Sequence, residues 1–344
     1  GIGVSDGSLV NYTNRKGCDI GVSDGSIDYS YCYDANNNIL EATNNINGNK
    51  TTRSYNNYGE LTAETLETGI TLEYSYDLAG RVNELTLPDS SKVLYSHSAF
   101  LDKVSRLSPA GKELYSHTIL DRDLSGFSQS VQLAHNAGTV STTRDTLGRI
   151  TSITHPHFTE QVPEHGFDPV GNLLELTTNN IKREFSYDWL SQLIAEPEHS
   201  YQYDSLYNRL KKDTTTYELN SLHAVTAIND TSITYDKRGN RIGDPHATYR
   251  YDALNRLIEV QTKTGSYHYT YDAFNRRLSK QTDATTEYYL WAQENEIGAL
   301  DESKNITQLR ILAEGLGAEI GASIALELYG TTYIPLHDRQ GSIT

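Results

Sequence analysis

Residues Tyr251–Leu257 read YDALNRL, and residues Tyr271–Arg277 read YDAFNRR. Each stretch has an aromatic residue, an aspartate, two spacers, a residue that tolerates a left-handed backbone, and an arginine. Aspartate opens turns because its carboxylate accepts hydrogen bonds from nearby backbone N–H groups. Asparagine and glycine enter the left-handed region at low cost. A type I turn followed by a left-handed residue in a G1 bulge is a common hairpin connection, so the motif predicts a hairpin tip.

Versions of this motif recur along nearly the whole chain, and neighbouring copies lie roughly twenty residues apart, the length of two strands and two turns. The motif residues are Tyr33, Asp34, Tyr76, Asp77, Gly80, Arg81, Asp168, Gly171, Tyr187, Asp188, Tyr203, Asp204, Tyr235, Asp236, Gly239, Tyr251, Asp252, Asn255, Arg256, Tyr271, Asp272, Asn275 and Arg276. Close variants are Tyr55-Asn56 with Gly59 and Arg144-Asp145 with Gly148-Arg149. A fixed unit repeated in this way indicates a repeat array.

Two copies depart from the pattern at the left-handed position. Ser191 stands there in the copy that begins at Tyr187. In the copy that begins at Tyr203, Tyr207 occupies the position and Asn208 follows it, so we expect Asn208 to take the left-handed conformation. Around Ser98–Val104 and Thr118–Leu124 the motif is decayed.

The repeats predict an all-β array of antiparallel hairpins, because each unit can bury its faces only against its neighbours. In Ser266–Tyr271, SYHYTY, the tyrosines alternate with other residues and therefore share one face of a strand. We expect the array to occupy residues 1–290, with residues 106–165 the least regular part and the place for loop insertions or a packing plug. Residues 291–344 are expected to form a C-terminal segment that covers the array.

Composition excludes several classes of protein. The formal net charge of −16 argues against binding to nucleic acids or to anionic membranes. The apolar stretch Ile311–Leu328 contains three glutamates, each costing about 2–3 kcal/mol in a bilayer, so membrane insertion is not expected. Cys18 and Cys32 are the two cysteines, and whether they pair is left open. The chain has no Met and begins at Gly, which favours a piece of a longer polypeptide.

The tandem motif resembles the YD repeats of the Rhs family, which includes Rhs toxins, the C subunits of Tc toxins and the teneurins. The resemblance extends over essentially the whole chain, and Tyr333–Thr344, YIPLHDRQGSIT, is similar to the HDxxGS segment near the end of such shells. It implies a spiralling antiparallel sheet that closes into a hollow shell. Such shells are associated with self-cleavage near a DPxGL-like sequence, which Asp168–Leu173, DPVGNL, resembles. Because this stretch carries an extra Asn and lies in register with the repeats, we interpret it as an ordinary turn.

The sequence gives little support for a catalytic or metal-binding site. His155 and His157 could share a metal on one strand face, but no nearby cysteine or carboxylate completes a ligand set. The motif aspartates are interpreted as turn caps, and no GxSxG nucleophile elbow is present. We therefore expect no enzyme activity, cofactor or metal.

Two functions remain. The first, implied by the resemblance, is a structural shell of a secreted polymorphic toxin that encloses a polypeptide cargo, with the rest of the parent polypeptide or an enclosed toxin domain as partner. The alternative is a secreted or cell-surface adhesion module whose tyrosine rows bind a glycan or a surface receptor. Solvent exposure of Tyr251, Tyr269 and Tyr271 distinguishes them, because buried ladders favour the scaffold and an exposed aromatic patch favours binding.

Overall fold

The computed structural model describes residues 2–3, 9–13, 21–23, 27–313 and 322–344. Within these ranges the chain is built from β-strands and a single turn of 3-10 helix at Ala134–Asn136. The all-β fold of tandem antiparallel hairpins expected from the sequence is thus confirmed. Residues 314–321, in the middle of the apolar stretch Ile311–Leu328, lie outside the described residues, as does Cys18.

The chain divides into two compact units. Unit 1 comprises the described residues of Gly1–Ser116, His246–Ala313 and Ser323–Tyr333, and unit 2 comprises His117–Pro245 and Ile334–Thr344. Strand β12, Glu113–Arg122, spans the boundary between them.

The first part of unit 1 consists of short strands, most of them paired with the next strand along the chain. These strands are β1 Ile2–Gly3, β2 Leu9–Thr13, β3 Gly21–Ser23, β4 Asp28–Tyr33, β5 Ile39–Asn44, β6 Lys50–Tyr55, β7 Leu61–Thr65, β8 Thr71–Tyr76, β9 Val82–Thr86, β10 Lys92–His97 and β11 Leu101–Leu107. The second part repeats this arrangement with strands taken from late in the chain. They are β28 Ala247–Tyr251, β29 Leu257–Thr262, β30 Ser266–Tyr271, β31 Arg277–Gln281, β32 Thr286–Ala292, β33 Asn295–Leu300, β34 Ile306–Leu312, β35 Ser323–Leu328 and β36 Thr331–Tyr333.

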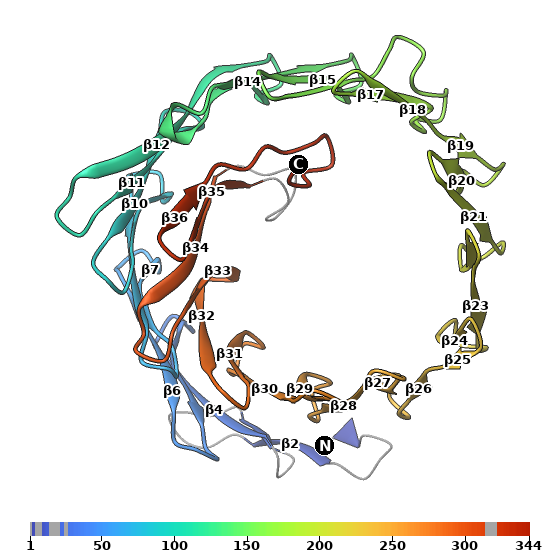
Figure 1. Ribbon diagram of the computed structural model, residues 1–344. Helices are drawn as coiled ribbons and strands as arrows, with labels where there is room; N and C mark the ends of the chain where they lie inside the picture. The colour runs from blue at the N-terminus through green and yellow to red at the C-terminus, as the bar shows by residue number, and fades with distance from the viewer. Residues whose placement is uncertain (1, 4–8, 14–20, 24–26, 314–321) are drawn as a thin grey trace. The chain divides into compact units, whose positions relative to one another are not determined.

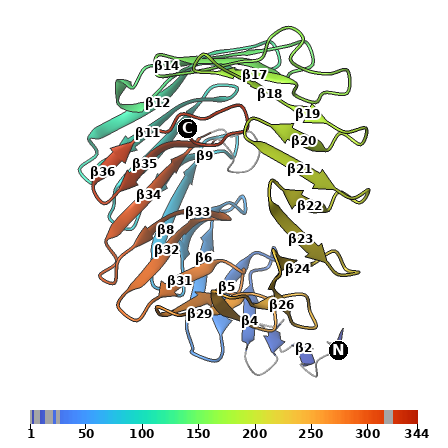
Figure 2. The same ribbon diagram turned by 45° about the vertical axis from the view of Figure 1, so that its right-hand side comes forward.

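Within unit 1 the late strands lie against the early ones as a second layer (Figures 1 and 2). Apolar side chains from both layers form the core, because alternate residues of each strand face the other sheet. Fully buried members are Leu72, Val93, Leu290, Leu300, Leu309 and Ile311. Burying each of these side chains contributes about 1.5–3 kcal/mol, so the two layers stabilise one another.

Unit 2 continues the series of hairpins. Its strands are β13 Ser128–Gln132, β14 Thr139–Arg144, β15 Ile150–His155, β16 Phe158–Gln161, β17 Glu175–Thr178, β18 Ile181–Glu184, β19 Ser186–Tyr187, β20 Leu193–Glu196, β21 His199–Tyr203, β22 Arg209–Lys212, β23 Thr215–Leu219, β24 Val225–Ile228, β25 Thr231–Ser232, β26 Thr234–Tyr235 and β27 Arg241–Gly243. Residues 106–165, where the sequence predicts loop insertions or a plug, mostly form such strands. Their irregularity consists of the 3-10 turn and the register shifts within β12.

Candidate functional site

The YD motif forms one recurring corner, and the corner at Asp77 shows its parts. The Asp77 N–H donates to the Arg81 carbonyl at 2.9 Å, and the Gly80 N–H donates to the Asp77 carbonyl at 3.0 Å. The Asp77 carboxylate accepts from the backbone N–H groups of Ala79 and Arg81 through Oδ1, and from the Arg81 Nε through Oδ2. Gly80 has a φ of 76°, in the left-handed region. The hydrogen bond from Arg81 lowers the pKa of Asp77 to about 2, so the cap stays charged.

The same carboxylate bonds recur at Asp168, Asp204, Asp236, Asp252 and Asp272, where the fifth residue of the turn is Asn or Arg. Asp34 and Asp188 cap their turns through the same backbone donors. The left-handed residues are Asn37, Gly80, Gly171, Ser191, Gly239, Asn255 and Asn275. The DPVGNL stretch is therefore a corner like the others.

One expectation about these corners is wrong. Tyr207, with a φ of 65°, takes the left-handed conformation that the sequence assigned to Asn208. The reason is that Asn208 occupies the arginine position, where its side-chain amide donates to the Asp204 carboxylate at 2.8 Å. Because the Asp204 cap fixes the register of the turn, the residue before Asn208 must be left-handed whatever its side chain.

Sequence reasoning missed several of the corners that lack the tyrosine. They begin at Asp123, Asn220, Asp301 and Asp338 and have the same backbone hydrogen bonds. These corners can still be recognised by the capping Asp or Asn. The residue three positions after the cap is left-handed, as Lys304 and His223 show. The HDxxGS stretch near the C-terminus is one of these corners.

At several corners the motif tyrosine couples its hairpin to the one before it. The Tyr76 hydroxyl donates to the Leu61 carbonyl at 2.8 Å, and the Tyr271 hydroxyl donates to the Leu257 carbonyl at 2.9 Å. The register of the two strands shifts at this tyrosine, which gives the bulge that the motif predicts. The tyrosine is therefore a link between repeats rather than a part of the turn.

Removing one such hydroxyl should cost about 1 kcal/mol of unfolding free energy, because the Leu61 carbonyl loses its partner in Tyr76→Phe. Chemical denaturation followed by circular dichroism measures the loss. Tyr58→Phe is the matched control, because the Tyr58 side chain is almost fully exposed at a neighbouring corner. Equal stabilities of the two variants would show that the hydroxyl link contributes nothing.

At several corners the side chain at the arginine position links the corner to the next. Arg256 donates to the Asp272 carbonyl at 2.9 Å in unit 1. In unit 2 the Gln192 amide donates to the Asp204 carbonyl at 3.0 Å, and the Asn208 amide contacts the His223 ring at 2.9 Å. Successive corners thus form a ladder of hydrogen bonds along the edge of the sheet.

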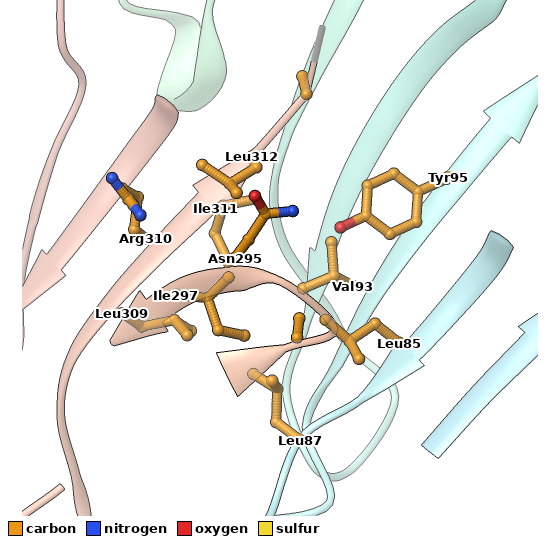
Figure 3. Close-up of a pocket in the computed structure, with 12 residues that line it drawn as sticks. Leu85, Leu87, Val93, Tyr95, Asn295, Ile297, Leu309, Arg310, Ile311 and Leu312 are labelled. Carbon is orange, nitrogen blue, oxygen red and sulfur yellow. The ribbon is translucent and has the colours of Figure 1, made fainter. Parts of the chain in front are cut away.

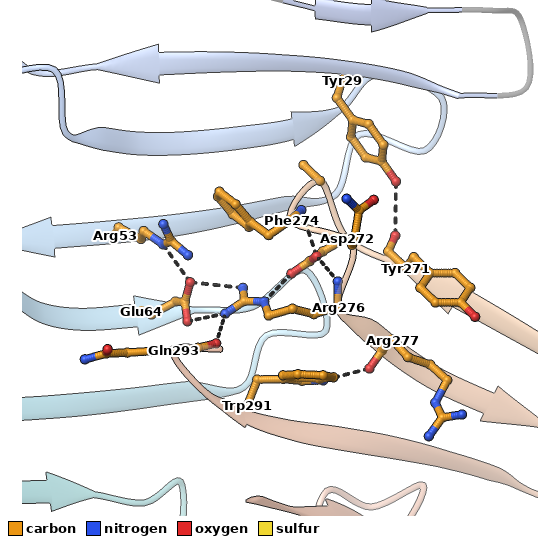
Figure 4. Close-up of polar contacts among 12 residues, drawn as sticks. Tyr29, Arg53, Glu64, Tyr271, Asp272, Phe274, Arg276, Arg277, Trp291 and Gln293 are labelled. Atoms are coloured by element: carbon orange, nitrogen blue, oxygen red, sulfur yellow. Dashed lines mark hydrogen bonds and ion pairs between the residues drawn. The ribbon is translucent and has the colours of Figure 1, made fainter. Parts of the chain in front are cut away.

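A buried ion cluster joins the two layers of unit 1 (Figure 4). The Arg276 guanidinium contacts Glu64 of β7 at 2.8 Å and Asp272 of its own corner at 2.7 Å. Arg53 of β6 completes it at 2.7 Å from Glu64, so two cations face two carboxylates. Arg276 is 2% exposed and both carboxylates are fully buried. Although burial opposes the charged form, the hydrogen bond that Arg276 donates to Glu64 and the carboxylate charges raise the pKa of Arg276 above its ordinary value.

Glu67 lies beside this cluster and has an unusual protonation state. Burial and the Asp272 charge raise its pKa to about 7, although Asn44 donates to it and Arg256 and Arg276 lie nearby. Between about pH 4.5 and 7, the folded state therefore holds a proton on Glu67 that the unfolded state, with an ordinary pKa of 4.5, has lost. Stability from this group is full below its unfolded pKa and is lost as the pH rises through the folded pKa.

Glu67→Gln should flatten the pH dependence of stability between about pH 4.5 and 7, since glutamine does not titrate. The variant should gain stability relative to the parent at pH 8 and differ little at pH 4. Urea denaturation at both pH values measures this. A parallel shift of the two proteins across the range would contradict the assignment to Glu67.

A cavity of about 190 Å³ lies between β9–β10 and β33–β34 in unit 1 (Figure 3). It is lined mainly by apolar side chains such as Leu85 and Val93, with Tyr95, Asn295 and Arg310 as polar members. Its lining residues include no carboxylate, histidine, cysteine or hydroxyl nucleophile other than the tyrosine. In the described part of the chain, no group of three or more His, Cys, Asp or Glu side chains is placed to hold a metal ion.

Two known families match the parts of the chain that contain many of these corners. The family described as Teneurin YD-shell matches residues 164–291, and the family described as RHS Repeat matches residues 33–71 and 55–92. Together these matches cover more than half of the chain. The chain belongs to the YD-repeat (Rhs) family. The matched YD-repeat families are structural scaffolds, and the matched residues include most of the corners described above.

Solved structures that align with this chain include Tc toxin complexes. The crystal structure of TcdB2-TccC3 without its hypervariable C-terminal region aligns with 93% of this YD-repeat chain at 12% identity and a TM-score of 0.48. The TcdB2-TccC3-Cdc42 structure aligns with 86% at 13% identity and a TM-score of 0.34. The Photorhabdus luminescens Tc holotoxin pore aligns with 92% at 12% identity and a TM-score of 0.27. The chain spans 20%, 20% and 27% of those chains, respectively. No curated protein sequence matches it.

Proposed function

We propose that this YD-repeat chain forms part of the wall of a secreted, Rhs-type toxin shell that encloses a polypeptide cargo. In this proposal residues 1–290 are the repeat array and residues 291–344 cover it. The partner is the rest of the parent polypeptide or an enclosed toxin domain. The observation that carries the proposal is membership of the YD-repeat family together with the ladder of corner bonds, which links successive repeats of the wall.

The tyrosine rows favour this scaffold over a glycan-binding module. Tyr251, Tyr269 and Tyr271 are half-buried rather than gathered in an exposed patch. The Arg277 guanidinium lies 5.7 Å from the Tyr269 ring centre, and the Arg256 guanidinium lies 5.0 Å from that of Tyr271. Rings that already have a cation over them are less available for stacking on a sugar.

Other observations are compatible with the proposal. In the described ranges no helix has the length and apolar character of a membrane span. The formal net charge of −16 disfavours association between copies of the chain, because molecules of like charge repel one another.

A protease-protection experiment on the native protein from its producing cells tests enclosure. We expect a cargo polypeptide that survives protease while the wall is folded and is digested once the wall has been unfolded. The same protein, unfolded before protease is added, is the control. Equal digestion in both samples would reject enclosure, and strong binding to a glycan array would support the adhesion alternative instead.

A further inference from the structure

Unit 2 presents a row of apolar side chains, one from each successive corner. Each of them is at least 64% exposed, and each comes from the first or second position after the residue that caps the turn. The row consists of Leu124, Leu147, Val170, Trp189, Leu206 and Leu222. At the next corner, Lys237 and Arg238 occupy these positions and end the row. Turn positions ordinarily favour polar residues, so a repeated apolar side chain there requires a reason.

Leu124, Leu147 and Val170 come from corners of the 18-stranded sheet, and Trp189, Leu206 and Leu222 come from corners of the 7-stranded sheet β19–β25. Within each sheet these corners lie on one edge because each joins one hairpin, whereas the turns between hairpins lie on the opposite edge. Corners at Asp188, Asp204 and Asn220 connect β19–β20, β21–β22 and β23–β24 (Figure 2). Successive corners are two strands apart, about 9.6 Å at the usual strand spacing. The row therefore has a regular period.

Negative charge lies beside the row. The Asp188 and Asp204 caps have glutamine and asparagine at the arginine position, so no cation from their own corner neutralises them. The hydrogen bond from Asn208 lowers the pKa of Asp204, which is therefore ionised at neutral pH. The corner positions around Trp189 and Leu206 thus combine apolar surface with unneutralised carboxylates.

At two other corner sites in the molecule a cation lies over an aromatic ring, and these sites show which side chains can contact such a surface. In unit 1, Phe274 occupies the equivalent corner position, and the Arg53 guanidinium lies 3.9 Å from its ring centre with the Tyr31 ring at 6.4 Å. In unit 2, Arg339 of the C-terminal segment lies 5.1 Å from the ring of Phe167, next to the Asp168 cap. A cation supplied by another segment lies over an aromatic ring at each of these corners, while Val170 of the second corner stays exposed.

We propose that this apolar row is a docking edge for a cationic polypeptide in an extended conformation, with an apolar residue at every third position. A polyproline II segment has three residues and about 9.3 Å per turn, close to the spacing of the corners. One apolar side chain per turn would contact one corner, and the intervening cations would face the cap carboxylates and the Trp189 ring. The proposal does not depend on whether the wall encloses a cargo.

The test uses the whole chain and a synthetic peptide of repeated Leu-Lys-Pro triplets. We expect saturable binding, a shift of Trp189 emission to shorter wavelength as the indole leaves water, and weakening at high salt. Matched peptides replace the leucines by serine or the lysines by glutamate, and each should bind about tenfold more weakly or worse. A peptide of the same composition with its leucines clustered tests the three-residue period.

Variants locate the site. The triple variant Trp189→Ser, Leu206→Ser and Leu222→Ser should bind the Leu-Lys-Pro peptide at least about tenfold more weakly, because three of the contacts are lost. Ile181→Ser is the control, since Ile181 is 69% exposed but lies beside the opposite turn at Asn179 and Asn180. Thermal unfolding verifies that the variants remain folded, as expected for exposed turn positions. Failure of the peptide to bind, equal binding of the serine peptide, or unchanged affinity of the triple variant would each overturn the proposal.

Discussion

Arg276→Met should destabilise unit 1 by about 3–5 kcal/mol, the usual effect of removing one partner from a buried ion pair. The variant leaves Glu64 and Asp272 facing one another in the core with only Arg53 to neutralise them. It also removes the hydrogen bond from the Arg276 guanidinium to the Gln293 carbonyl, which links the corner to the β32–β33 turn. Methionine fills much of the volume of arginine, so the loss reports on charge more than on packing.

The tryptophans allow this loss to be measured in unit 1 alone. Trp291 lies in unit 1, where its indole N–H donates to the Arg277 carbonyl at 2.8 Å, and Trp189 lies in unit 2. In a Trp189→Phe background, urea denaturation followed by Trp291 emission gives the stability of unit 1. Arg250→Met is the control, because Arg250 forms an exposed pair with Glu259 that is worth less than about 1 kcal/mol. A loss in Arg276→Met no larger than in this control would show that the cluster does not hold the layers together.

Gly298→Ala should cost about 3 kcal/mol, at the upper end for insertion of a methyl group into a packed interior. A Cβ at Gly298 of β33 would lie 2.1 Å from the Gln308 carbonyl oxygen and 3.2 Å from the Leu309 Cα. These are backbone atoms of the adjacent strand β34, so a side-chain rotation cannot relieve the contact. The pair of strands must separate, and their ladder of hydrogen bonds weakens.

Gly111→Ala is the appropriate comparison for this variant, because a Cβ there meets nothing within 4 Å. Gly111 has a φ of 78°, so alanine should cost about 1–2 kcal/mol through backbone strain alone. Urea denaturation of both variants in the Trp189→Phe background measures the difference. If Gly298→Ala proves the milder change, β33 and β34 do not approach as closely as described.

The sequence predicts the corners well because each is determined by a few adjacent residues. A capping carboxylate, a left-handed residue and a bulge at the tyrosine are all local properties, and they are visible in YDALNRL. The motif does not identify some corners without a tyrosine, such as that at Asp123. The reason is that the tyrosine belongs to the links between hairpins and the turn forms without it.

Contacts between distant strands could not be predicted in the same way. Glu64 lies between Ala63 and Thr65 in β7 and has the appearance of an ordinary outward-facing strand residue. Its burial results from the second layer, which places Arg276 against it across 212 residues of sequence. The local sequence of a repeat does not determine which distant repeat it packs against. The ion cluster and the cavity therefore depend on the packing of the two layers.

The corner ladder has a consequence for how such a chain can change length during evolution. In unit 2, Gln192 and Asn208 each contact the corner that follows, Gln192 through a backbone carbonyl that every copy has. Duplication or loss of one complete hairpin there would join a corner to another of the same kind and leave no mismatch. In unit 1, pairs such as Arg276 with Glu64 specify individual partners, so the same event would displace a charge from its counterpart. Variation in repeat number should therefore accumulate in the single-layered part of the chain.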